Sequence, residues 1–227
     1  MKKVAIFDVD GTIFRSSMVI ELVETMIEKG VFPKGVSQEY ESEYKEWFER
    51  ESEYEAYVNA VVKTFMKHIK GVHYSVFSDI VDLIVEKQQK RVYRYTRDLI
   101  QTLKKDGYFL LAISQSPKTA VDAFCKNLGF DKVYGRIYEI GPQDLFTGVI
   151  IDEHLIMNKA NIVHRALEKE GLSLAGSIGV GDTEGDIPLL ELVEEPICFN
   201  PNSMLYTHAK RQGWKVIVER KDVIYSL

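Results

Sequence analysis

Short, continuous apolar runs alternate with stretches of helical periodicity along most of the chain. Apolar runs of this kind, bounded by turn residues, are typical of strands that are covered on both faces. Five runs are present, at residues 4–7, 108–114, 177–180, 196–199 and 214–218. The helical patterns between them carry cap signals, with Asn158 before one helix, Gly171 after it, and Ser116-Pro117 before another. This alternation predicts an α/β fold, a doubly wound parallel sheet with a Rossmann-like core.

Residues 15–92 interrupt the alternation between the first and second predicted strands. Apolar residues recur at helical spacing from Met18 to Ile27 and again from Tyr40 to Ile69, and a third helix is predicted from about residue 75 towards residue 89. We therefore expect an inserted all-helical cap domain at residues 15–92 and an α/β core made of residues 1–14 and 93–227. The tyrosines of the insertion are expected to belong to its helical core rather than to a ligand cage; they are Tyr40, Tyr44, Tyr54 and Tyr57.

Composition and charge exclude several classes of protein. The 227 residues are 45% hydrophobic and 28% charged, which is an ordinary globular balance and argues against disorder. The net charge of −5 argues against a nucleic-acid partner and against a basic membrane-docking surface. Cys125 and Cys198 form no CxxC pair, and no apolar run has the length of a signal peptide or a membrane span. We expect a cytoplasmic protein, and no pattern predicts its oligomeric state.

The most informative stretch follows the first apolar run, where Asp8, Asp10, Gly11 and Thr12 are found. Because side chains alternate along a strand, the two carboxylates start on the same side. Two close carboxylates repel each other unless a cation or a proton lies between them. The pattern therefore indicates a bound metal ion, or a pair in which one group is an acid and the other a base. A simple Asp-Gly turn is the alternative. A calcium EF-hand loop is rejected because its twelfth position is Val19 rather than Glu.

Three later segments also end strands or begin helices with polar residues. Ser114 ends the second apolar run and leads into a predicted helix N-terminus, which favours an anion. Lys159 begins a helix, an unfavourable place for a cation, so another group is expected to hold it there. Lys118 is a weaker candidate for a lysine held at the site in this way. Asp182 follows the third apolar run directly, and Asp186 comes four residues later.

The order and spacing of these segments resemble the motifs of the haloacid dehalogenase superfamily, in particular its phosphoserine-phosphatase-like subgroup with a helical cap. The resemblance extends over nearly the whole chain. It implies that Asp8 is a nucleophile that becomes an aspartyl phosphate and that Asp10 is the general acid and base. The presence of Asp10 favours a phosphatase over a dehalogenase, because the dehalogenases lack this second Asp.

The same resemblance implies roles for the remaining motif residues. The residues expected to bind the substrate phosphoryl group are Ser114, Gln115 and Lys159. The expected Mg²⁺ ligands are Asp8, the backbone carbonyl of Asp10, and Asp182. Thr12 and Asp186 are expected to support them. Together these expectations describe a Mg²⁺-dependent phosphomonoester hydrolase that acts on a small phosphorylated metabolite.

Two alternatives remain open from the sequence. A phosphotransferase would use the same aspartyl phosphate and pass the phosphoryl group to an alcohol, and a non-enzymic regulatory protein could share the scaffold. A signalling receiver domain is set aside because it has no helical insertion after its first strand. The substrate is also open. Phosphoserine phosphatases usually have a Gly pair after the motif Ser and a Glu nine residues after the nucleophile. This chain has Gln115-Ser116 and Ser17 at those places, which makes phosphoserine doubtful.

Overall fold

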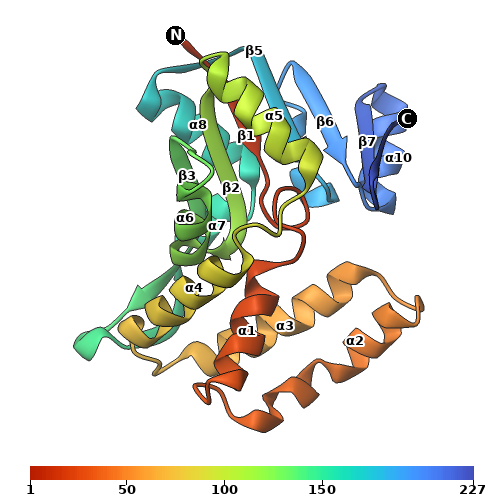
Figure 1. The fold of residues 1–227 in the computed structure, drawn as a ribbon. Helices are drawn as coiled ribbons and strands as arrows, with labels where there is room; N and C mark the ends of the chain where they lie inside the picture. Colours follow the sequence, from red (N-terminus) through yellow and green to blue (C-terminus); the bar gives the residue numbers. More distant parts are fainter.

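One eight-stranded sheet, in the order β4-β3-β2-β1-β5-β6-β7-β8, runs through this computed structural model, which describes residues 1–227 (Figure 1). The strands are β1 (Lys2–Phe7), β2 (Phe109–Pro117), β3 (Lys132–Ile140), β4 (Phe146–Ile151), β5 (Leu172–Gly181), β6 (Glu195–Phe199), β7 (Lys215–Arg220) and β8 (Val223–Ser226). The six central strands pair in parallel, whereas β4 and β8 are antiparallel at the two edges. The predicted parallel α/β sheet is confirmed, and the antiparallel edges extend it.

Helices precede and follow the strands as the alternation predicts. Those of the segment between β1 and β2 are α1 (Met18–Glu28), η1 (Lys34–Glu39), α2 (Glu41–Phe48), α3 (Tyr54–Ile69), α4 (Tyr74–Gln88) and α5 (Arg94–Lys105). Those that follow β2 are α6 (Lys118–Lys126), η2 (Pro142–Asp144), α7 (Glu153–Ile156), α8 (Lys159–Glu170), η3 (Glu184–Asp186), α9 (Ile187–Leu190) and α10 (Ser203–Gln212). None of these helices combines the length and the apolar character that crossing a bilayer would need.

The central strand β1 shows why both faces of the sheet are covered. Ala5 and Phe7 point to one face and pack with residues of α5 and α6. Val4 and Ile6 point to the other face and pack with residues of α8, α9 and α10. All four side chains are fully buried, as a continuous apolar run predicts.

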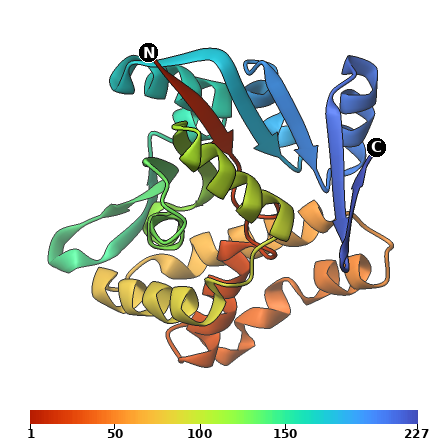
Figure 2. The same ribbon diagram turned by 45° about the horizontal axis from the view of Figure 1, so that its top comes forward.

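The helices α1 to α4 form a cluster of their own beyond the carboxyl ends of the parallel strands, and the two views agree on this placement (Figures 1 and 2). Their buried side chains make a hydrophobic cluster in which Phe65 and Phe77 lie with ring centroids 6.2 Å apart. The cluster also includes Tyr138 of β3 and Phe146 of β4. The helical segment is therefore joined to the β3–β4 hairpin by apolar packing.

Two helix boundaries differ from the sequence pattern. The helix predicted to begin at Ser116-Pro117 begins at Lys118, because β2 continues to Pro117, which pairs with Arg136 of β3. The periodic stretch from Tyr40 to Ile69 is divided between α2 and α3. The helix around residues 158–171 is as predicted. The Asn158 side chain caps α8 by accepting from the Ala160 N–H, and Gly171 ends it in the left-handed conformation.

Candidate active site

The strand order reverses beside β1, and two aspartates lie at the ends of the strands that meet there. Asp8 directly follows β1, and Asp182 directly follows β5, its parallel neighbour. The Asp8 N–H donates to the Val180 carbonyl at 2.9 Å, which holds the two strand ends in register. Doubly wound sheets bind ligands in the crevice at such a reversal.

Gly11 allows the loop after β1 to pass close to β5. Its φ is +79°, and a Cβ built on it would lie 2.1 Å from Oδ2 of Asp182. A side chain at this position would therefore need both a strained backbone and a displaced carboxylate. In the same loop, the Thr12 hydroxyl donates to Oδ1 of Asp182 at 3.0 Å. Gly11 and Thr12, in the loop after β1, thus position the side chain of Asp182 at the end of the neighbouring strand β5.

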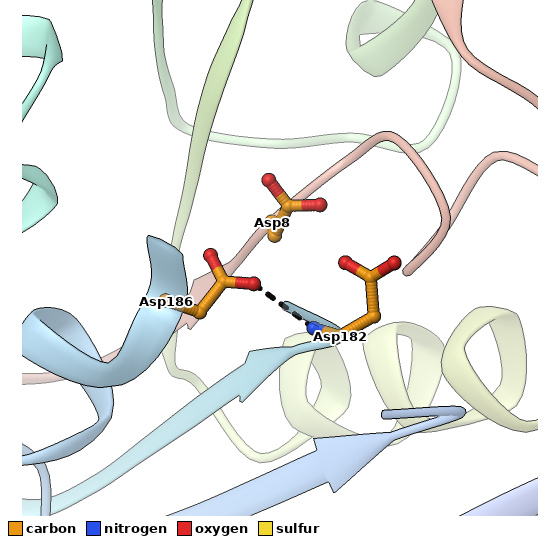
Figure 3. A group of neighbouring side chains, drawn as sticks. All are labelled: Asp8, Asp182 and Asp186. Carbon is orange, nitrogen blue, oxygen red and sulfur yellow. Dashed lines mark hydrogen bonds between the residues drawn. The ribbon is translucent and has the colours of Figure 1, made fainter. Parts of the chain in front are cut away.

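Three carboxylates converge at the end of β1 (Figure 3), and the ammonium group of Lys159 lies against two of them. Oxygen atoms of Asp8, Asp182 and Asp186 lie within 4.8 Å of one another. Lys159, the first residue of α8, donates to Oδ1 of Asp8 and to Oδ1 of Asp186, both at 2.5 Å. The Lys159 side chain is 5% exposed. Its place at a helix start, unfavourable by itself, is explained by these two carboxylates.

Asp186 also organises the loop after β5. Its Oδ2 accepts from the N–H groups of Asp182 and Thr183, at 2.9 and 3.1 Å, and its side chain is fully buried. The first of these bonds is drawn in Figure 3. One carboxylate therefore orients both the lysine and the backbone that carries Asp182.

Burial and crowding determine the protonation of this cluster. Burial raises the pKa of Asp8 to about 7, against the opposing effect of Lys159, and the neighbouring Asp186 and Asp10 raise it further. The pKa of Asp182 is also raised well above its usual value, first by burial and then by Asp8 and Asp186. Burial disfavours the charge of Lys159, but Asp186 and Asp8 outweigh it and raise the pKa of the lysine.

This donor set fits a divalent cation. The three carboxylates, of which Asp8 and Asp186 are buried, have a single ammonium group beside them, so the cluster carries excess negative charge that only protons or a further cation can balance. Carboxylate oxygens are the ligands that Mg²⁺ prefers. Asp8 and Asp182, both predicted as metal ligands, lie together in the cluster, and Asp186 lies with them.

Asp10 points to a different part of the site from the cluster. Its Oδ1 accepts from the Met18 N–H at 2.6 Å, and its Oδ2 accepts from the Ser114 hydroxyl at 2.6 Å. Ser114 is fully buried, and its Oγ also accepts from the Ser116 N–H at 2.9 Å. The residue predicted to contact the phosphoryl group, Ser114, is thus bonded to the predicted acid and base in this structure.

A cavity of about 520 Å³ opens over the carboxylate cluster. Its core side includes Asp8, Asp10, Gln115, Lys159 and Asp182. Its opposite side comes from the segment between β1 and β2, including Ser17, Glu53, Tyr54, Glu55, Val58 and Asn59. Asp8, Asp10, Gln115, Lys159 and Asp182 therefore share one cavity with the helical segment. The other predicted residues, Ser114, Thr12 and Asp186, are fully buried and do not line it. Lys118, the weaker candidate for the lysine role, instead pairs with Asp122.

Several cavity residues were missed by sequence reasoning. Tyr40 and Tyr57 are buried in the helical core as expected, but Tyr54 lines the cavity. Arg136, Asn200 and Asn202 line it as well. For Arg136 the sequence did hold a signal of a functional residue, because it is a charged residue in the middle of the mostly uncharged stretch that forms β3.

The family model described as haloacid dehalogenase-like hydrolase matches residues 5–191. The chain belongs to this family. The resemblance predicted from the motifs is confirmed, and the expectation of an enzyme agrees with it. The haloacid dehalogenase-like chain is 24% identical over 226 residues to the histidinol-phosphatase of Neisseria meningitidis, covering 96% of this chain and 99% of that one. It is 25% identical over 228 residues to the phosphoserine phosphatase of Methanocaldococcus jannaschii, covering 98% and 94%.

Other similarities concern parts of longer proteins, or the fold alone. The chain is 28% identical over 127 residues to the hydrolase ML2424 of Mycobacterium leprae, but it spans only 42% of that protein. A protein of unknown function from Bordetella pertussis Tohama I shares the fold with a TM-score of 0.73 at 17% identity, covering 95% of this chain and 98% of that one. A phospho-aspartyl intermediate analogue of phosphoserine phosphatase shares the fold with a TM-score of 0.64 at 23% identity, covering 97% of this chain and 95% of that one.

Proposed function

We propose that this haloacid dehalogenase-like hydrolase is a Mg²⁺-dependent phosphatase that hydrolyses small phosphate monoesters through an aspartyl phosphate on Asp8. The observation that carries the proposal is the position of Asp8. Its carboxylate lies at the floor of the cavity, bonded to Lys159 and close to Asp182 and Asp186. Relatives named for two different phosphate esters, histidinol-phosphatase and phosphoserine phosphatase, support a small alcohol phosphate as the substrate class.

Asp8, Asp182 and the backbone carbonyl of Asp10 would hold the Mg²⁺ ion, with Asp186 beside them. When bound, the ion supplies positive charge that keeps Asp8 ionised and offsets the charge of the phosphate. Lys159, which is bonded to Asp8, adds the positive charge of its ammonium group. Thr12 and Asp186 act as positioning residues, because each bonds to Asp182 or to its backbone.

In the first step, a carboxylate oxygen of Asp8 forms a bond to phosphorus while the bond from phosphorus to the leaving oxygen breaks. Protonated Asp10 gives its proton to that oxygen, and an alcohol leaves. In the second step, Asp10 takes a proton from water, the water oxygen bonds to phosphorus, and the bond from phosphorus to Asp8 breaks. The hydrogen bonds from Met18 N–H and Ser114 hold the Asp10 carboxyl group in one orientation for both transfers.

Residues 15–92 are proposed to be the cap of this enzyme. The cap covers the cavity with side chains of α1 and α3. Exclusion of water by such a cover favours transfer within the enclosed site and strengthens its electrostatic contacts.

The test is the hydrolysis of an aryl phosphate with Mg²⁺ and with EDTA. We expect turnover only with Mg²⁺, and a loss of at least about 1,000-fold in kcat for Asp8→Asn. Asp98→Asn, which removes an exposed carboxylate from α5, is the matched control and should keep full activity. Acid quenching during turnover should trap phosphate on the wild-type protein and none on Asp8→Asn. Full activity in EDTA, or in Asp8→Asn, would overturn the mechanism.

A further inference from the structure

Arg136 of β3 is a buried arginine without an ionic partner, and it lines the active-site cavity. It is 7% exposed. Its Nη2 donates to Oε1 of Gln115 at 3.1 Å and contacts Sδ of Met157 at 3.7 Å, while its buried Nε has no hydrogen-bond partner. Arg136 and Lys159 are the only cationic side chains among the cavity residues. Lys159 is paired with two carboxylates, but Arg136 is paired with none.

A buried guanidinium group needs a negative partner. It stays charged at any pH at which the protein is folded, and a buried charge without a counter-ion is strongly unfavourable. Its planar set of donors matches the two oxygens of a carboxylate or phosphate. Arg136 lines the open cavity, which leaves room for such an oxyanion, and its unpartnered Nε shows that the protein itself does not satisfy all donors of the guanidinium group.

The position of Arg136 separates this oxyanion from the phosphoryl group that is transferred. Asp8 follows β1, while Arg136 lies on β3, two strands away, which corresponds to about 10 Å between the backbones. Arg136 is also next to the helical segment. Two residues along β3, Tyr138 packs against Phe65 of α3 with ring centroids 5.4 Å apart. The leaving group of a bound ester would lie between Asp8 and the helices α1 and α3 that line the cavity.

We propose that Arg136 binds an oxyanionic group, a carboxylate or a second phosphate, on the leaving group of the substrate. The preferred substrates are then phosphate monoesters of acidic alcohols rather than of neutral ones. This inference rests on the proposed phosphatase function and adds the substrate class to it. Glu53 and Glu55 line the same cavity, so Arg136 supplies the attraction that an anionic leaving group needs there.

The experiment compares three esters with related carbon skeletons: glycerol phosphate, phosphoglycerate and glycerol bisphosphate. Binding is measured by calorimetry with Mg²⁺ in an Asp8→Asn background, so that no turnover occurs. We expect phosphoglycerate, glycerol bisphosphate or both to bind about 10–100-fold more tightly than glycerol phosphate. The two acidic esters distinguish a carboxylate from a phosphate as the preferred group.

Adding Arg136→Gln to this background should remove the preference and leave glycerol phosphate binding nearly unchanged. Arg136→Lys should restore part of it. Arg211→Gln, which removes an exposed arginine of α10, is the matched control and should change nothing. The same pattern is expected in kcat/KM of the variants that keep Asp8.

Two results would overturn the inference. An equal loss for all three esters would assign Arg136 to the transferred phosphoryl group, and no loss for any ester would make it purely structural. Both results are independent of the test of the proposed function. If that function fails because EDTA leaves aryl phosphate turnover intact, the binding measurement still decides whether Arg136 selects an acidic leaving group. If Asp8→Asn itself keeps turnover, the comparison of kcat/KM for the three esters in the variants that keep Asp8 decides it instead.

Discussion

Lys159 and Arg136 are both buried cations in one cavity, yet their surroundings are opposite. Lys159 is bonded to Asp8 and Asp186, so its charge is paired within the folded protein. Arg136 has only uncharged neighbours, namely the Gln115 amide, the Met157 thioether and the Tyr138 hydroxyl, and its Nε is unpartnered. We call the chemical end of the cavity the complete end, because its cation is paired within the protein, and the leaving-group end the incomplete end, because its cation is left for the substrate to pair.

The largest effect is expected when the complete end loses its cation. Lys159→Gln leaves the buried carboxylates of Asp8 and Asp186 without a positive partner, and removal of one member of a buried pair costs about 3–5 kcal/mol of unfolding free energy. The measurement is denaturant unfolding in EDTA, with Lys169→Gln, an exposed residue of the same helix, as control. Equal stability of the two variants would contradict the pairing seen here.

A smaller effect is expected from a partner of the metal ligands. Thr12→Val keeps the size of the side chain but removes the donor to Oδ1 of Asp182. Loss of such an outer partner lowers metal affinity by about 10–100-fold. The Mg²⁺ concentration for half-maximal activity should rise by this factor, with Thr102→Val, an exposed site, as control. An unchanged Mg²⁺ titration would separate Thr12 from the metal site.

The pH dependence of the complete end follows from Asp8. Its pKa is raised to about 7, first by burial, so the folded metal-free protein binds a proton that the unfolded chain releases near pH 4. The unfolding free energy contributed by this group is therefore present at low pH and is lost as pH rises through about 7. In the proposed function Mg²⁺ binds Asp8 in place of that proton, so its stabilising effect should be larger at about pH 8 than at about pH 6. Melting temperatures with Mg²⁺ and with EDTA at the two pH values test this. A Mg²⁺ effect independent of pH would contradict it.

The smallest change in stability is expected at the incomplete end. Arg136→Gln loses a neutral-acceptor hydrogen bond but also removes a buried charge without a counter-ion. These effects oppose each other, so the unfolding free energy should change by less than about 1 kcal/mol. Denaturant unfolding beside Lys159→Gln gives a direct comparison. A loss of unfolding free energy as large as that of Lys159→Gln would show that Arg136 has a partner within the protein, and the two cations would then not differ.

The residues at the chemical end could be predicted from the sequence because each of them lies at the end of a strand or at the start of a helix. Asp8 and Asp182 directly follow apolar strands, and parallel strands bring their carboxyl ends to one edge. Lys159 was indicated by its unfavourable place at a helix start, which the two carboxylates now explain. In each case a strand or helix end, visible in the pattern, also determines where the side chain lies.

The leaving-group end could not be predicted in this way. Tyr54 was assigned to the helical core because it falls in the helical periodicity from Tyr40 to Ile69, but helical spacing does not say which side of a bundle faces a cavity. Arg136 lies on β3, which pairs with β4 in an antiparallel hairpin that the parallel pattern did not include. The hydroxyl of Ser114 was expected to face the phosphoryl group, and its bond to Asp10 depends on packing between distant segments.

The shared hydrophobic cluster of the helical segment and the β3–β4 hairpin has a consequence for dissecting this protein. Phe146, 5% exposed, and Tyr138, 8% exposed, owe their burial to the side chains of α3 and α4. Excision of residues 15–92 would leave both aromatic rings on the surface of the remaining sheet, at the edge that already carries an antiparallel strand. An uncovered apolar edge of this kind promotes self-association. A minimal α/β fragment of this protein is therefore expected to aggregate unless these two positions are first made polar.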